Sequence, residues 1–198
     1  MTIVYDYNDS LYINMTNKCP CACIFCIRRE TNHVGNSDNL WLKKEPTVEE
    51  VIEEIKKVDM SKYEEVVFCG YGEPLERIEE VVEVSKFLKD NYDVKVRVNT
   101  NGLADLIHKR KTAQLLKNNV DAISISLNAP NKERYNEIVK PKFGEESFEA
   151  LLQFARDCKE YVKEVNFSLV DIISEEEIEE AKKLAEEMNI PLKVRHKN

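Results

Sequence analysis

Strand-like and helix-like segments alternate along the whole chain, and this alternation restricts the fold more than any other feature. The segments with strand patterns are Val4–Tyr7, Ser10–Met15, Glu65–Cys69, Val94–Asn99, Ala122–Leu127, Val165–Val170 and Pro191–Arg195. The segments with helical periodicity are residues 46–58, Arg77–Tyr92, Leu106–Lys117, Asn131–Ile138, Phe148–Tyr161 and Ser174–Met188. Strands that alternate with helices form parallel sheets with right-handed crossovers.

The length of the chain limits how far such a sheet can close. The first two strands form a hairpin around Asn8 and Asp9, which leaves six strands separated by helices. A complete eight-stranded barrel needs about 250 residues, and this chain has 198. We therefore expect a single α/β domain over residues 1–198: an open, partial (β/α)6 TIM-like barrel with a short N-terminal hairpin. A flavodoxin-like doubly wound sheet is the alternative.

Charge and hydropathy exclude several classes of function. The chain has 29 basic and 37 acidic residues, so its net charge of −8 argues against a broad nucleic-acid footprint. No apolar run is long enough to span a bilayer, and residues 1–6 lack the features of a signal peptide. We expect a cytoplasmic protein with no membrane partner, in which six reduced cysteines serve metal or redox chemistry.

Cys19, Cys23 and Cys26 form a C-x3-C-x-aromatic-C run directly after the second strand. Three thiolates within eight residues can hold one side of an iron–sulfur cluster, and four are needed to ligate it fully. Three would leave one iron open to a ligand. If Cys21 is the fourth ligand, the chain is an iron–sulfur electron carrier or redox sensor.

A zinc site is a further alternative, because Cys23 and Cys26 match a zinc half-site. Such a site needs a second ligand pair. The remaining cysteines and the histidines are scattered along the chain: Cys69, Cys158, His33, His108 and His196.

With Phe25 beside the last cysteine, the run resembles that of the radical S-adenosylmethionine (SAM) superfamily, and the chain looks most like the small TatD family-associated radical SAM proteins. The resemblance implies a [4Fe–4S] cluster on Cys19, Cys23 and Cys26, with SAM on the open iron and Phe25 near its adenine. It implies an enzyme in which the reduced cluster cleaves SAM to a 5′-deoxyadenosyl radical, which abstracts hydrogen from a substrate. The resemblance also implies an electron donor of the flavodoxin or ferredoxin type that reduces the cluster. The substrate is either a macromolecule or a small molecule covered by a partner.

Two turns at strand ends extend the resemblance. Residues 71–74 (Tyr71, Gly72, Glu73 and Pro74) are similar to the family's Gly-Gly-Glu motif, with Tyr71 in place of the first glycine. The resemblance implies that they grip the SAM amino group. Asn99, Thr100 and Asn101 correspond to a turn that meets the SAM ribose or the cluster side, although Asn-Gly turns also form for local reasons.

The strand Ala122–Leu127 alternates polar and apolar residues. Ser124, Ser126 and Asn128 share one face, so in a barrel they would line the lumen, where they need hydrogen-bond partners. The resemblance implies that SAM supplies these partners; ordered water is the alternative. By the same resemblance Val170 touches the adenine. Candidate contacts for an anionic substrate, which are also ordinary surface residues, are Arg28, Arg29, His33, Trp41, Lys140, Lys142, Arg195 and His196.

Overall fold

Seven strands form one sheet in which spatial order follows sequence order. The computed structural model describes residues 1–35 and 37–197. The strands are β1 (Val4–Tyr7), β2 (Ser10–Ile13), β3 (Glu65–Phe68), β4 (Lys95–Thr100), β5 (Ala122–Ser126), β6 (Glu164–Val170) and β7 (Leu192–Arg195). Strands β2 to β7 are parallel and β1 pairs antiparallel with β2, so β1 and β7 stand at opposite ends of the sheet. The predicted partial barrel with an N-terminal hairpin is confirmed.

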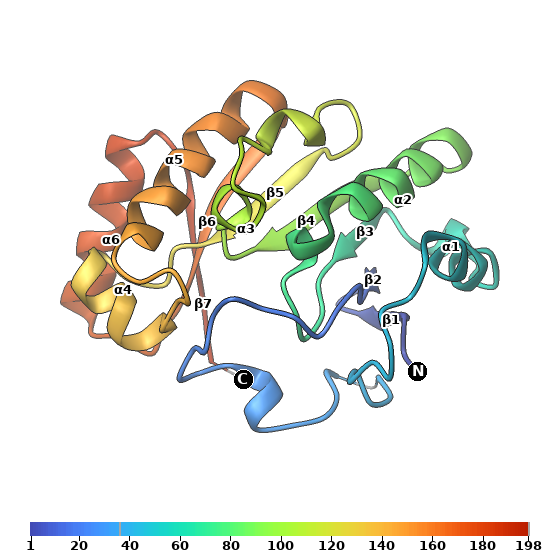
Figure 1. Cartoon of the computed structure of the whole chain (residues 1–198), viewed down its shortest axis with the longest axis horizontal. Coiled ribbons are helices and arrows are strands. Elements are labelled where there is room, and N and C mark those ends of the chain that lie inside the picture. Colours follow the sequence, from blue (N-terminus) through green and yellow to red (C-terminus); the bar gives the residue numbers. More distant parts are fainter. Residues whose placement is uncertain (36, 198) are drawn as a thin grey trace.

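The helices lie on the outer face of the curved sheet. They are α1 (Val48–Lys56), α2 (Ile78–Asn91), α3 (Ala104–His108), α4 (Lys132–Val139), α5 (Glu146–Tyr161) and α6 (Glu175–Glu187). Four short 3-10 helices join them: η1 (Ile27–Arg29), η2 (Met60–Lys62), η3 (Pro74–Arg77) and η4 (Ala113–Leu116). Figure 1 shows the blue segment after β2 crossing the opposite side of the sheet, where both ends of the chain also lie.

Local sequence signals set the ends of several elements. Asn8 and Asp9 have φ angles of 47° and 57°, which makes the tight turn between β1 and β2. Thr47 and Ser174 each accept a hydrogen bond from the third residue of the helix that follows, and a glutamate side chain at that residue bonds back. These two capping boxes confirm the predicted starts of α1 and α6.

Alternation along the strands divides the apolar residues into two groups. Ile123, Ile125 and Phe167 are fully buried between the sheet and the helices, in the larger cluster. A second cluster combines residues of β1, β2 and β3 with two residues from the segments beyond them: Tyr5, Tyr12, Leu40, Val67 and Tyr71. Because neighbouring residues of a strand point to opposite faces, this second cluster lies on the inner side of the sheet.

The predicted helix Leu106–Lys117 is wrong. The chain forms α3, leaves it at Lys109 in a left-handed conformation with a φ of 53°, and then forms η4. The Asp105 carboxylate accepts hydrogen bonds from the backbone and side chain of Thr112, at 2.9 Å and 2.7 Å. These bonds stabilise the turn between the two short helices in place of a continuous helix.

None of the described helices combines the length and the apolar character needed to cross a membrane.

Candidate cofactor site

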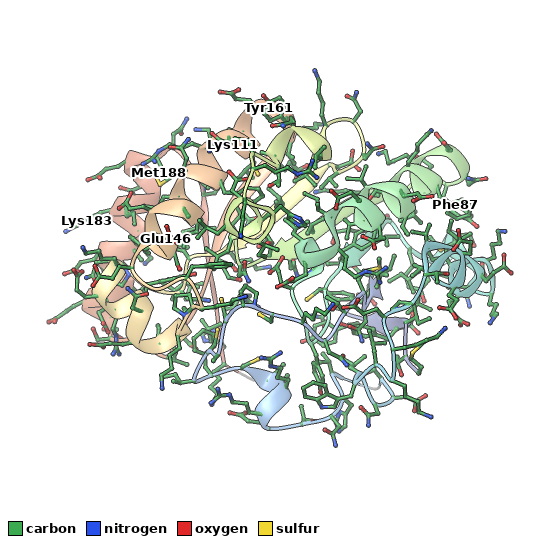
Figure 2. The ribbon with its side chains drawn as sticks, viewed as in Figure 1. Phe87, Lys111, Glu146, Tyr161, Lys183 and Met188 are labelled. Atoms are coloured by element: carbon green, nitrogen blue, oxygen red, sulfur yellow. The ribbon has the colours of Figure 1, made fainter. Side chains whose placement is uncertain are left out.

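The cysteine loop is held in shape by the end of α4, more than a hundred residues further along the chain. Ala22 donates its backbone N–H to the Val139 carbonyl at 3.1 Å, and Ile24 donates to the Ile138 carbonyl at 2.9 Å. Cys21 forms an isolated antiparallel bridge with Pro141. The loop therefore has a backbone partner along the stretch that carries its first three cysteines. In Figure 2 the labelled Phe87, Lys111 and Tyr161 mark the helix-covered side, away from this loop.

Arg28 stabilises the cysteine loop through hydrogen bonds to backbone carbonyls. Its guanidinium donates to the backbone carbonyls of Asn17 at 3.3 Å, Tyr71 at 3.4 Å and Cys21 at 3.3 Å. Sequence analysis placed Arg28 among candidate contacts for a substrate. The structure gives this side chain three carbonyl partners, and its positive charge also lowers the pKa of the Cys19 and Cys23 thiols.

The thiols of Cys19, Cys21 and Cys23 influence one another's pKa values. Interaction with the Cys21 thiol lowers the pKa of Cys19 to about 7 and also lowers that of Cys23. The same interactions raise the pKa of Cys21. Burial raises the pKa of the Cys26 thiol. Thiolates are the form that binds metal, and the lowered pKa values of Cys19 and Cys23 favour that form.

The donor set suits an iron–sulfur cluster. Thiolates are the usual ligands of such clusters, and each thiolate of a cubane binds a different iron, so the ligands need not converge on one point. In residues 1–35 and 37–197, no group of three or more His, Cys, Asp or Glu side chains has the geometry to hold a single metal ion. Cys19, Cys23 and Cys26 nevertheless lie in one short loop, with the Asn101 amide 3.9 Å from the Cys19 sulfur.

Gly72 lets the turn after β3 approach the cysteine loop. A Cβ atom at this position would lie 2.3 Å from the Thr16 carbonyl oxygen and 2.5 Å from that of Lys18. The next residue, Glu73, donates its backbone N–H to the Lys18 carbonyl at 2.7 Å. The requirement for glycine here is steric, because only a residue without a side chain leaves room for these carbonyls.

Glu73 is a buried carboxylate that joins the turns after β3 and β4. It accepts hydrogen bonds from the Thr100 hydroxyl at 2.6 Å, the Asn101 backbone N–H at 2.7 Å and the Leu75 backbone N–H at 3.0 Å. Burial, followed by the nearby Cys19 thiol, raises the pKa of Glu73 to about 7. Pro74 is buried at the start of η3, which Glu73 caps. The structure thus brings Gly72, Glu73, Thr100 and Asn101 together beside the cysteines.

The Tyr71 side chain packs against Thr31 and Trp41 in the segment that follows the cysteine loop. Its hydroxyl donates to the Thr31 carbonyl at 2.6 Å, and its ring packs edge-on against Trp41 with centroids 5.1 Å apart. The ring is buried. Its observed partners are residues of that segment.

The predicted polar residues of β5 do lie on the inner side of the sheet. Ser124 accepts a hydrogen bond from the Asn166 amide of β6 at 3.0 Å, and Ser126 stands beside Ser168 in the register. Asn128 has a left-handed φ of 58°, and its buried Oδ1 has no hydrogen-bond partner among the described residues. An unpartnered buried acceptor is unusual and fits a position that meets a ligand.

An inner cavity of about 260 Å³ extends from the cysteine loop across the sheet. Four of its lining residues belong to the predicted cluster and SAM site: Phe25, Cys26, Asn99 and Val170. They also include residues that sequence analysis did not assign, among them Tyr5, Tyr12 and Cys69. The alternation of β1 and β2 was the available signal, because it places Tyr5, Tyr7 and Tyr12 on one side.

A larger hollow of about 730 Å³ opens at the amino ends of the strands. Four of its charged side chains form ion pairs with one another: Lys89 with Asp121 at 2.8 Å, and Lys95 with Glu164 at 2.6 Å. No cysteine lines it. Parallel barrels carry their sites at the carboxyl ends of the strands, so the smaller cavity is the candidate site.

Comparisons with known proteins identify the family to which the chain belongs. The model of the radical SAM superfamily matches residues 13–188. A GTP 3',8-cyclase of Clostridium perfringens (strain 13 / Type A) is 27% identical over 133 residues, which cover 67% of this chain and 38% of that protein. A probable dual-specificity RNA methyltransferase RlmN of Microcystis aeruginosa is 31% identical over 146 residues, covering 73% of this chain and 40% of the relative. The chain thus spans about two fifths of the length of these relatives.

Solved structures share the fold. A radical SAM methyltransferase from Sphaerobacter thermophilus superposes with a TM-score of 0.67 at 18% identity, covering 98% of this chain and 68% of that one. SuiB of Streptococcus suis, bound to its precursor peptide SuiA, gives 0.71 at 17% identity, with 98% and 40% covered. The family model extends over most of the chain and includes the cysteine loop, and the chain therefore belongs to the radical SAM superfamily.

Proposed function

We propose that this chain is a single-domain radical SAM enzyme that binds its cluster through Cys19, Cys23 and Cys26. Members of the superfamily are enzymes that use a [4Fe–4S] cluster and SAM. The observation that carries the proposal is the cysteine loop itself, which backbone bonds from Ala22 and Ile24 hold against the end of α4, with the Asn101 amide beside the Cys19 sulfur.

The chain's own residues have distinct tasks in this function. When bound, the cluster and SAM together supply a carbon-centred radical that removes a hydrogen atom from the substrate. Glu73 fixes the turn after β3, and the backbone of this turn at Gly70 and Gly72 would bind the SAM amino group. Asn101 donates toward the sulfur of Cys19, and Ser124, Ser126 and Asn128 offer polar atoms to the ribose and carboxylate. Phe25 and Val170 enclose the adenine.

Cys21 is a neighbour of the cluster ligands that does not itself ligate the cluster. Its backbone is fixed by the bridge to Pro141 and by the Arg28 guanidinium, and its side chain is buried. It is the residue that separates this proposal from the electron-carrier alternative, in which four cysteines ligate the cluster and no iron is open to SAM.

The test is anaerobic reconstitution with iron and sulfide, reduction with dithionite, and measurement of 5′-deoxyadenosine formed from SAM. We expect the parent protein to form it. Alanine at Cys19, Cys23 or Cys26 should abolish both the cluster and the product. Cys21→Ala is the matched control and should retain both. If Cys21→Ala loses its cluster, or if the parent's cluster leaves SAM intact with a competent electron donor, the electron-carrier alternative is correct.

The partners follow from the chemistry. A one-electron donor of the flavodoxin or ferredoxin type has to reduce the cluster, and a reducing cytoplasm suits six free cysteines. The relatives' names mention GTP and RNA, and one structure contains a precursor peptide. With its net charge of −8, this chain is a poor match for RNA, and we propose a small molecule or a peptide as substrate. A TatD-type hydrolase is the candidate functional associate.

A further inference from the structure

The inner cavity has an aromatic wall of three tyrosines, to which the proposed function gives no role. The Tyr5 and Tyr12 rings are tilted with centroids 5.3 Å apart, and Tyr7 meets Tyr12 edge-on at 5.5 Å. All three rings line the cavity, and Phe25 of the cysteine loop lines it as well. Aromatic side chains bind planar or apolar bodies through large contact areas and defined ring geometry. This wall therefore suits a compact ligand with a planar body.

A cationic wall stands at the end of β7, where three basic residues follow one another. His196 pairs with Asp171 at 2.6 Å, and Lys197 pairs with Glu30 at 2.8 Å. Arg195 forms no ion pair with any residue in 1–35 or 37–197; its guanidinium makes one long contact, 3.5 Å to the Ser168 hydroxyl. Of the three, Arg195 alone brings to the cavity a charge that no described carboxylate compensates.

The positive charge of Arg195 acts on the Cys69 thiol, which lines the cavity. Burial raises the pKa of the Cys69 thiol in the cavity wall, while the Asn99 side chain and the positive charges of Arg195 and Arg97 act in the opposite direction. Arg97 is neutralised by Glu65 at 2.8 Å. The uncompensated positive charge in the cavity is thus that of Arg195, on the opposite end of the sheet from the tyrosines.

We propose that the cavity binds a small anionic substrate, with a carboxylate or phosphate group on Arg195 and a planar body against the tyrosine wall. A guanidinium presents paired N–H donors that match both oxyanions. The cavity has a volume of about 260 Å³ and also includes Phe25 and Val170 of the proposed adenine site, so the ligand beside them is a small molecule or one side chain of a larger one. This inference rests on the proposed function, because it names the substrate class of that same site.

The test uses the reconstituted, SAM-bound protein and three probes of similar shape: benzoate, phenyl phosphate and neutral benzyl alcohol. Calorimetric titration should show one or both anions binding about ten-fold or more tightly than benzyl alcohol. The stronger of the two anions identifies the oxyanion. Arg195→Gln should remove the preference for the anion, whereas Lys197→Gln, the matched control with its own carboxylate partner, should keep it. Tyr7→Leu should weaken the charged and neutral probes by a similar factor.

Each other outcome overturns the inference. Equal binding of benzyl alcohol and both anions removes the anionic class. An equal loss of the anion preference in Lys197→Gln would show that the positive charge of the surface as a whole, and not Arg195, attracts the anion. Weakened SAM binding in Arg195→Gln would assign the arginine to the cofactor. Failure of the parent protein to form 5′-deoxyadenosine would refute the proposed function separately, because probe binding is measured without turnover.

Discussion

Gly72→Ala isolates a steric requirement at the contact between the turn after β3 and the cysteine loop. The added Cβ would lie 2.3 Å from the Thr16 carbonyl oxygen, and real Cβ atoms essentially never approach closer than 3.0 Å. Gly72 is not among the residues with a left-handed backbone, so the substitution adds no backbone strain. The whole effect must come from displacement of backbone atoms, which cannot rotate away as a side chain can.

The size of the effect follows from these distances. Moving from 2.3 Å to 3.0 Å requires the Thr16 carbonyl to shift by at least about 0.7 Å. The shift acts against the bond from the Glu73 N–H to the Lys18 carbonyl, which is 2.7 Å long. Overpacking of this kind typically costs about 1–3 kcal/mol of unfolding free energy. Since the strain falls on the segment that precedes Cys19, we expect the variant to lose most of its cluster.

Two measurements test this reasoning: urea unfolding of the apoprotein, and iron and sulfide content after anaerobic reconstitution. Val84→Ala is the matched control, because it removes two methyl groups from a fully buried position on α2 and costs about 2 kcal/mol. The control should lose similar stability and keep its cluster. Full iron content in Gly72→Ala, or equal cluster loss in both variants, would refute a local steric cause.

Three further variants test the site and its surroundings. Arg28→Lys keeps the positive charge but cannot bridge three carbonyls, so we expect faster loss of iron to a chelator with little change in the pH profile of thiol alkylation; the reverse pattern would make charge the main role. Tyr135→Phe removes a buried hydroxyl without a hydrogen-bond partner among the described residues and should raise the unfolding free energy by about 1 kcal/mol; a comparable loss would reveal a bonded hydroxyl. Glu73 has a pKa of about 7 in the folded apoprotein against an ordinary 4.5, so it favours the folded state most below pH 4.5, and this contribution is lost as the pH rises to about 7. Relative to Glu73→Gln, the parent should therefore lose up to about 3 kcal/mol of unfolding free energy across that window in urea melts, and a constant difference would contradict the raised pKa.

Local signals were sufficient for most of the fold. The alternation around Ile123 and Ile125 identified a strand with one face under helices, and both side chains are fully buried there. The helical patterns over residues 46–58 and Ser174–Met188 predicted α1 and α6, whose starts are fixed by capping boxes within one turn. The cysteine spacing predicted a cluster site, since its three candidate ligands lie within eight residues of each other, and this assignment stays a prediction.

The parts that sequence analysis missed depend on contacts between distant segments. The expected helix ends at Lys109, which has a left-handed conformation. Lysine rarely adopts this conformation, so the residue type gave no signal that the helix would end there. The Glu73 carboxylate is directed to Thr100 and Asn101 by the packing of neighbouring strands. The tyrosine wall of the cavity likewise exists only because the hairpin joins the end of the sheet in one register.

The contacts between the cysteine loop and α4 have a consequence for biosynthesis. The bonds of Ala22 and Ile24 to Val139 and Ile138, and that of Lys142 to Pro20, close a loop of more than a hundred residues. Closure of so long a loop costs chain entropy and depends on the intervening strands having paired. A ribosome-bound chain that ends before Lys142 thus has all the cysteines of its metal motif but not the framework that arranges them. For the proposed cluster, delivery of iron and sulfide is therefore productive only after Lys142 and the strands before it have folded against the cysteine loop.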